Sequence, residues 1–205
     1  MPLVGGAPRK ILTDVEDADF SPDGKELAVS RVVEGRHRLE YPIEKVLYEP
    51  EGWVSNVRVS RDGEHVAFID HPIAGDDRGA VCVVDRAGKK TVLADGWAST
   101  IGLAWSPGGD EVWFTATEMG QNDALWAVDL KGRRRLLARS PGRLALQDVG
   151  PTGELLVTEG RVRLGMGWGT ADGKTARDLS WLDATVVSDI SRDGRSVVFA
   201  EQGSG

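Results

Sequence analysis

The residues best suited to chemistry in this 205-residue chain lie in one polar segment, HPIAGDDRG, at residues 71–79. Its side chains could act as a base, as metal ligands or as charged binding groups: His71, Asp76, Asp77 and Arg78. Hydrolysis or metal binding would require these groups to converge with further ligands. The chain offers few, with three histidines and a single cysteine, Cys82, inside the apolar run AVCVV. We therefore interpret the segment as a solvated loop available for binding, without a metal or other cofactor.

Three tryptophans form a second candidate site. EGWVS and DGWAS place Trp53 and Trp97 at equivalent positions 44 residues apart, and Trp181 in LSWLD begins a corresponding connection further along the chain. An exposed ring of indoles favours binding of a peptide or protein, because tryptophan combines a large contact area with a polar N–H group. The alternative is that each indole wedges between neighbouring structural units as part of the core. The sequence leaves both interpretations open.

Catalysis by a serine nucleophile is not indicated. The GxSxG motif that usually marks such a residue is absent, since residues 102–106 read GLAWS. We expect a protein that is not an enzyme.

The net charge of −7 and the sequence pI near 5.1 argue against binding to nucleic acid. One basic cluster, at residues 133–135, falls in a predicted hairpin and is interpreted as a solvated turn. No stretch approaches 18 consecutive apolar residues, so we expect no membrane insertion within this chain. A protein or peptide partner is the remaining expectation.

The elements that must position these residues are defined by a phrase repeated five times. The copies read SPDGKELAV, SRDGEHVAF, SPGGDEVWF, GPTGELLVT and SRDGRSVVF, and their turn glycines are Gly24, Gly63, Gly109, Gly153 and Gly194. The glycine spacings of 39, 46, 44 and 41 give a period of about 40 residues with several short strands per period. This pattern is typical of the blades of a β-propeller. We therefore predict an all-β fold made of four-stranded antiparallel blades.

Turn residues divide each period into four strands. In the second repeat the predicted strands span residues 55–59, 65–69, 80–84 and 90–93, and the third repeat divides in the same way. The first and fourth repeats fit less cleanly, with residues 38–43 and 161–168 in the place of the third strand. Each turn glycine is expected at positive φ, where it closes a tight hairpin.

The whole chain, residues 1–205, is predicted to be one propeller domain or a fragment of one. The repeats span roughly residues 14–50, 51–95, 96–139, 140–181 and 182–205. Residues 1–13 are expected to form an outer hairpin that completes the fifth repeat. About five repeats permit two arrangements: a ring closed by pairing of the two termini, or an arc of a longer propeller.

The repeated phrase resembles the TolB-type WD40-like repeats, also called PD40 repeats, found in TolB and in the propellers of prolyl oligopeptidase relatives. Longer blocks, among them RLEYPIEKVLYEPEGW and HPIAGDDRGAVCVVD, resemble the propeller region that follows the kinase domain in a group of bacterial serine/threonine protein kinases. This resemblance implies a sensor or interaction module with a kinase domain in the parent chain, on the extracytoplasmic side of a membrane. The sequence contains none of the kinase motifs, so phosphotransfer is assigned to no residue here.

The expected function is therefore non-catalytic binding of a protein, peptide or small ligand, as part of a bacterial receptor-like kinase. The alternative is a substrate-gating propeller of a prolyl-oligopeptidase-like hydrolase, which would act with a hydrolase domain that this sequence does not contain.

Overall fold

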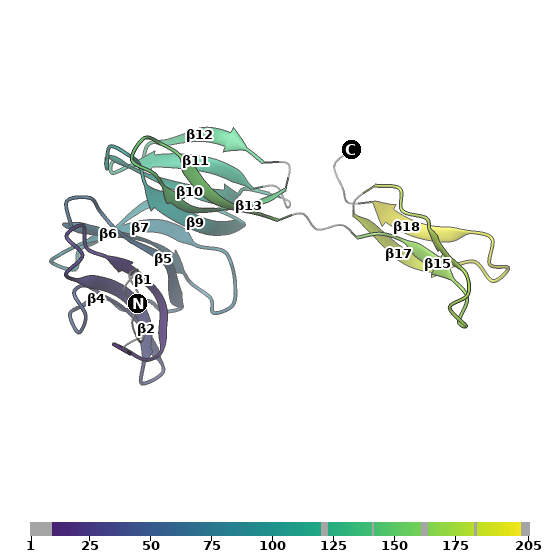
Figure 1. The fold of residues 1–205 in the computed structure, drawn as a ribbon, viewed down its shortest axis with the longest axis horizontal. Coiled ribbons are helices and arrows are strands. Elements are labelled where there is room, and N and C mark those ends of the chain that lie inside the picture. Colours follow the sequence, from purple (N-terminus) through teal and green to yellow (C-terminus); the bar gives the residue numbers. More distant parts are fainter. Residues whose placement is uncertain (1–9, 120–122, 141, 161–163, 183, 202–205) are drawn as a thin grey trace, which may run out of the picture. The chain divides into compact units, whose positions relative to one another are not determined.

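The computed structural model describes residues 10–119, 123–140, 142–160, 164–182 and 184–201. Within these residues all regular structure is β, in eighteen strands (Figure 1). The chain forms two compact units, Met1–Glu159 and Gly160–Gly205. None of the described residues forms a helix long and apolar enough to cross a membrane.

The first unit contains three successive blades, in each of which four strands pair antiparallel in chain order. Blade 1 consists of β1 (Val15–Phe20), β2 (Leu27–Val33), β3 (Arg36–Glu40) and β4 (Val46–Tyr48). Blade 2 consists of β5 (Trp53–Val59), β6 (His65–His71), β7 (Ala80–Asp85) and β8 (Lys90–Ala94). Blade 3 consists of β9 (Ser99–Trp105), β10 (Glu111–Thr117), β11 (Ala124–Asp129) and β12 (Arg134–Arg139). The strands predicted for the second and third repeats are confirmed.

The fourth repeat differs from the predicted blade. Its first hairpin, β13 (Arg143–Val149) and β14 (Leu155–Gly160), joins blade 3 in a six-stranded sheet through a parallel bridge between Leu146 and Gly102. Among the described residues, the strand in the place of the predicted 161–168 covers only Gly167–Gly169 (β15), and it pairs with β16 (Ala176–Asp178) in a two-stranded sheet. Glycine packs poorly in a strand, and this segment is rich in it. Residues 161–163 lie outside the described residues.

The fifth repeat contains the predicted first hairpin, β17 (Thr185–Ile190) and β18 (Val197–Glu201), in the second unit. At the other terminus, residues 1–9 of the expected outer hairpin lie outside the described residues, and residues 10–13 form no strand. Closure of a ring through the termini stays a prediction.

The SPDG-type turns are fixed by local hydrogen bonds. In the second copy the Ser60 hydroxyl donates to Asp62 (2.6 Å) and accepts from the His65 amide (2.9 Å). The Ser60 hydrogen bond also lowers the pKa of the Asp62 carboxyl. All five turn glycines have positive φ, between 69° and 98°, as predicted. The repeated phrase is therefore a structural signature.

The core lies between the blades. In β6, Val66 and Phe68 pack in the cluster shared with blade 1, while Ala67 and Ile69 pack in the cluster shared with blade 3. Because successive side chains of a strand point to opposite faces, blade 2 is buried on both sides. This explains the uninterrupted apolar run AVCVV in the next strand, β7.

We call the first strands of the three blades, β1, β5 and β9, together with β13 of the fourth repeat, the inner strands; each contacts the next in chain order. Asp17 and Asp19 of β1 accept hydrogen bonds from the amides of Val57 (2.7 Å) and Val59 (2.8 Å) in β5. Further along, the Asn56 side chain accepts from the Gly102 amide at 3.3 Å. Side chains thereby hold β1 to β5 and β5 to β9.

Gly102 is required where β9 meets β13. It has a φ of +72°, and a Cβ atom there would lie 2.3 Å from the Leu146 carbonyl oxygen. Gly24 has nearly the same φ, +71°, but a Cβ atom there would have no neighbour within 4 Å. Substitution of Gly24 therefore measures the backbone strain alone, without a steric clash. We expect Gly24→Ala to lower the free energy of unfolding by about 1 kcal/mol. Gly102→Ala should lower it by about 3 kcal/mol, because a clash with backbone is added.

Urea denaturation of the two variants measures this difference. Equal losses would show that the bridge between β9 and β13 adjusts without cost.

Candidate functional site

The candidate site lies at one end of the blades in the first unit. Because the four strands of a blade alternate in direction, the connections between the second and third strands and those between blades emerge at the same end. We call this end the loop face; in blade 2 it carries residues 49–52 before β5 and the 72–79 loop after β6. The SPDG-type turns lie at the opposite end.

His71, the last residue of β6, is the centre of the candidate site. Its side chain is buried, with the residue only 1% exposed. Nδ1 lies 3.0 Å from the backbone carbonyl oxygen of Arg78, and Nε2 lies 2.8 Å from the hydroxyl of Ser55. Since a carbonyl oxygen only accepts, Nδ1 carries the proton in the neutral ring and Nε2 accepts from Ser55. The imidazole therefore connects β5 to the far end of the 72–79 loop.

Trp53 covers the His71 ring. Their ring centroids are 4.0 Å apart and the planes are within 10° of parallel. The indole N–H donates to the Ile73 carbonyl at 3.1 Å, which fastens the start of the loop. Trp53 is half-buried, so part of its ring area is available at the loop face.

The 72–79 loop is also fastened to blade 3. The Thr100 amide of β9 donates to the Asp77 carbonyl (2.9 Å), and the Thr100 hydroxyl donates to the Gly79 carbonyl (3.2 Å). Gly79 is needed for this close approach, since a Cβ there would lie 2.6 Å from Ile69 and 2.9 Å from the His71 ring. The backbone of the loop thus contacts two blades.

The charged side chains of the loop pair mainly within it. Arg78 binds the Asp76 carboxylate through two nitrogens, and this pairing lowers the pKa of Asp76 to about 2. Asp77 lies 3.9 Å from Arg143 of β13. The Arg78 side chain is 57% exposed, and Ile73 is 51% exposed. The loop therefore exposes to solvent both an apolar side chain, Ile73, and a charged side chain, Arg78, that is paired with Asp76.

The other two predicted tryptophans do not share the surroundings of Trp53. Trp97 is 5% exposed and packs against Phe114 and Trp126 between blades 2 and 3, so its indole belongs to the core. Trp181 is 75% exposed, near Phe199 in the second unit. The equivalent sequence positions of Trp53 and Trp97 therefore do not give equivalent exposure, as the packing alternative allowed.

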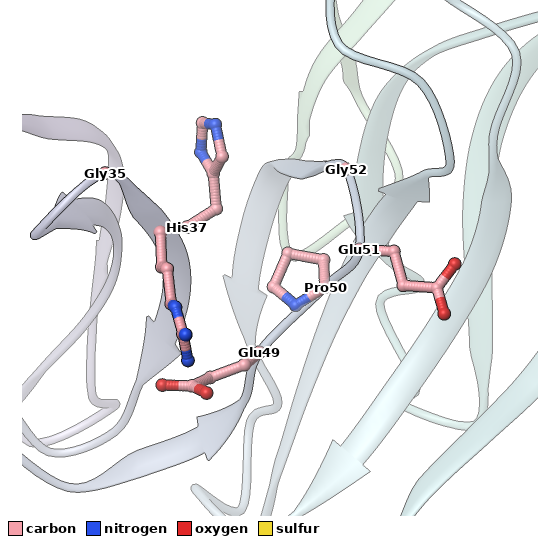
Figure 2. Close-up of a pocket in the computed structure, with 7 residues that line it drawn as sticks. Gly35, His37, Glu49, Pro50, Glu51 and Gly52 are labelled. Atoms are coloured by element: carbon pink, nitrogen blue, oxygen red, sulfur yellow. The ribbon is translucent and has the colours of Figure 1, made fainter.

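A shallow cleft of about 370 Å³ lies on blade 1, where the sequence predicted no site (Figure 2). Its lining includes His37 and residues 49–52. His37 pairs with Glu16 at 3.0 Å, and Arg38 pairs with Glu49 at 2.7 Å. In Figure 2 the Glu51 carboxylate points away from His37 and Glu49. The closely spaced charges at residues 36–38 were the available sequence signal. Of these, His37 and Arg38 pair with different acidic residues, Glu16 and Glu49, and do not converge on one point.

The described part of the chain contains no group of three or more His, Cys, Asp or Glu side chains placed to hold a metal. The hydrogen bond between Ser55 and His71 has the geometry of a nucleophile and its base. The ring is buried beneath Trp53, however, and the partner of Nδ1 is a backbone carbonyl rather than a carboxylate. The pair is arranged to hold the loop in place.

The comparisons with known proteins concern the fold. No family model and no curated protein matches the chain. Among solved structures it is similar to the TolB-type protein of Agrobacterium tumefaciens (TM-score 0.56, 20% identity, 80% of this chain and 64% of that chain). It is also similar to a puromycin-hydrolyzing peptidase of Mycobacterium tuberculosis (0.56, 18%, 84% and 34%) and to a prolyl endopeptidase (0.53, 17%, 85% and 31%).

Together with the blades, these similarities define the chain as an all-β protein of the β-propeller class, which confirms the predicted fold. Within that class its architecture is TolB-like. The chain spans 64% of the TolB-type chain and about a third of each peptidase chain.

Substitution separates the two tryptophan environments. Trp97→Ala removes a buried ring between blades, and we expect the free energy of unfolding to fall by about 3–5 kcal/mol. Trp53→Ala removes one stacking contact and one hydrogen bond at the loop face, and we expect a loss of about 1–2 kcal/mol. Urea denaturation checks both values. A loss for Trp53→Ala as large as that for Trp97→Ala would place Trp53 in the core as well.

Proposed function

We propose that this chain is a non-catalytic binding propeller whose loop face engages a protein or peptide partner. The observation that carries the proposal is the 72–79 loop. Its backbone is fastened by Trp53, His71 and Thr100, whereas the side chains of Ile73 and Arg78 are exposed. A loop already ordered before binding loses little conformational entropy when a partner docks. A rigid scaffold that presents polar and apolar side chains on a loop is suited to recognition.

Within this proposal the contact surface consists of Trp53, Ile73, Asp76, Asp77 and Arg78, with His71 supporting it from below. Trp97 is omitted because it is buried, and Trp181 because it belongs to the second unit. A small ligand is a less suitable occupant, because the cleft on blade 1 is lined largely by charged residues, among them Glu49 and Glu51.

We further propose that the propeller is the sensor or scaffold part of a bacterial receptor-like serine/threonine kinase. The resemblance of the sequence blocks around residues 38–53 and 71–85 to the propeller region of such kinases supports this setting. In that setting the parent chain carries a kinase domain, and the propeller lies on the extracytoplasmic side of the membrane.

The second candidate is a substrate-gating propeller of a prolyl-oligopeptidase-like hydrolase. The similarity in fold to the two peptidase chains favours it. The complete reading frame distinguishes the two settings. An upstream kinase domain supports the first, and a downstream α/β-hydrolase domain with a nucleophile elbow supports the second.

The binding surface is tested with peptides selected from a random library on the intact protein at pH 7.5. We expect the double variant Ile73→Ala/Arg78→Ala to bind the selected peptides at least tenfold more weakly, since it removes the exposed apolar group and the exposed guanidinium. Fluorescence polarisation measures the dissociation constants.

Arg133→Ala is the matched control. Arg133 is an exposed arginine paired within its own turn, to Asp129, and it lies at the opposite end of blade 3. Its loss should change affinity less than twofold. Peptides that bind both variants and the unmodified protein equally, or a library that yields no binders, would contradict the proposed surface.

A further inference from the structure

We propose that the partner of the loop face is a basic peptide segment, in which a lysine or arginine side chain lies next to an apolar one. The basic side chain binds in the cleft on blade 1, beside Glu51, and the apolar side chain covers Trp53 and Ile73. This inference rests on the proposed function, because it names the chemistry of the partner that the same face binds.

The cleft on blade 1, of about 370 Å³, is continuous with the proposed contact surface. The wall formed by the connection between β4 and β5 ends at Gly52, the residue before Trp53. A Cβ atom at Gly52 would lie 2.1 Å from the carbonyl oxygen of His71, so this wall packs against the end of β6. The Trp53 indole in turn donates to the Ile73 carbonyl in the loop that follows β6. A partner that covers Trp53 and Ile73 therefore lies next to the cleft.

A second cleft, of about 420 Å³, adjoins the first at the turn between β2 and β3. Gly35 of this turn lines both clefts, and the other residues of the second cleft come from the start of β1 and from the end of β2 and the turn after it. These parts of blade 1 all lie at the loop face, because its strands alternate in direction. The two clefts together give an extended peptide more room than a single side chain requires.

Acidic residues without a basic partner line both clefts. Glu51 lines the first cleft, and Asp14 and Glu34 line the second. All three residues are exposed, and no cation of the described residues pairs with any of their carboxylates. Figure 2 shows that the Glu51 carboxylate points away from the paired groups of Glu49 and His37. These carboxylates are free to bind a cation that a partner supplies.

The exposed cations of the neighbouring loop, by contrast, already have acidic partners. Arg78 binds the Asp76 carboxylate through two nitrogens. Arg143 lies 3.5 Å from the carboxylate of Asp123 and 3.9 Å from that of Asp77. The charges left without a partner near Trp53 are therefore mainly negative, which favours a basic partner.

Arg36 is the exception, and it makes the sign of the partner's charge testable. This residue is exposed, lines the first cleft and has no acidic partner among the described residues. A basic side chain in the cleft is attracted by Glu51 and repelled by Arg36, whereas an acidic side chain would experience the reverse. Removal of the two charges must therefore change the affinity in opposite directions.

The expected size of these effects is modest. An exposed ion pair contributes about twofold to fivefold in affinity, because water and salt screen it. The apolar contact with Trp53 and Ile73 is expected to supply more of the affinity, while the charges select the partner.

The test uses peptides selected from a random library on the intact protein at pH 7.5, in about 50 mM sodium chloride so that screening is weak. We expect the selected peptides to contain a lysine or arginine next to an apolar residue. Glu51→Gln should weaken their binding about twofold to fivefold, and Arg36→Gln should strengthen it by a similar factor. Fluorescence polarisation measures the dissociation constants.

Glu64→Gln is the matched control. Glu64 is an exposed glutamate in the turn between β5 and β6, at the opposite end of blade 2, so its substitution removes the same charge at a distance from the cleft. Affinity should change less than 1.5-fold, that is, by no more than about the screened long-range effect. All three substitutions replace exposed side chains without an ion-pair partner, so the variants are expected to fold.

A double-mutant cycle identifies the interacting pair. Replacement of the basic residue of a selected peptide by glutamine should abolish the difference between the unmodified protein and Glu51→Gln. Raising the salt to about 500 mM should weaken binding to the unmodified protein more than binding to Glu51→Gln.

Two outcomes separate this inference from the proposed function. If the selected peptides lack basic residues, or if Glu51→Gln and Glu64→Gln have equal effects, the basic partner is wrong while binding at the loop face stands. If basic peptides depend on Glu51 but bind Ile73→Ala as tightly as the unmodified protein, the proposed contact surface is wrong while the basic site on blade 1 stands. A library that yields no binders contradicts both.

Discussion

Burial of both faces of each blade is the constraint on which the rest of the structure depends. In blade 2, Phe68 faces blade 1 and Ile69, its neighbour in sequence, faces blade 3, so no strand position in the centre of the sheet is free for a polar functional group. Polar side chains that act on a partner must then lie at the ends of the blades. Trp97 illustrates the constraint. It lies in the connection before β9, two residues from the strand, and is nevertheless buried in the core between blades 2 and 3.

The inner strands present a second requirement, because β1 and β5 are edges of their own sheets and have amides without a ladder partner. Asp17 and Asp19 supply acceptors for the amides of β5. Burial raises the pKa of Asp19, while the hydrogen bond from Val59 and the charge of Arg58 lower it, so the carboxyl is kept at a cost that its contacts only partly offset. The presence of Asp17 and Asp19 on β1 is therefore explained by their hydrogen bonds to the backbone of β5.

Local chemistry explains which parts of the molecule could be predicted from the sequence. The Ser60, Asp62 and Gly63 turn depends on residues within five positions of one another, so the turns and the adjoining strands follow from the repeated phrase. The role of His71 depends on Ser55 and Arg78, and only β-pairing together with the path of the loop brings these to one ring. The sequence indicated a polar loop and a nearby tryptophan. It contained no signal for the stacked rings or for the contact with Thr100.

The loop face combines two properties that depend on the same contacts. Because the Asp77 carbonyl is held by Thr100, the 72–79 loop is part of the interface between blades 2 and 3 as well as a surface for a partner. A partner that binds the loop in its observed position would stabilise the interface between blades 2 and 3. Conversely, a change in how these blades pack would alter the loop, since loop position and blade packing depend on the same hydrogen bonds. His71 is the fully buried histidine among the three in the chain, and it lies where these contacts meet. Recognition and the order of the scaffold are thus coupled at one side chain.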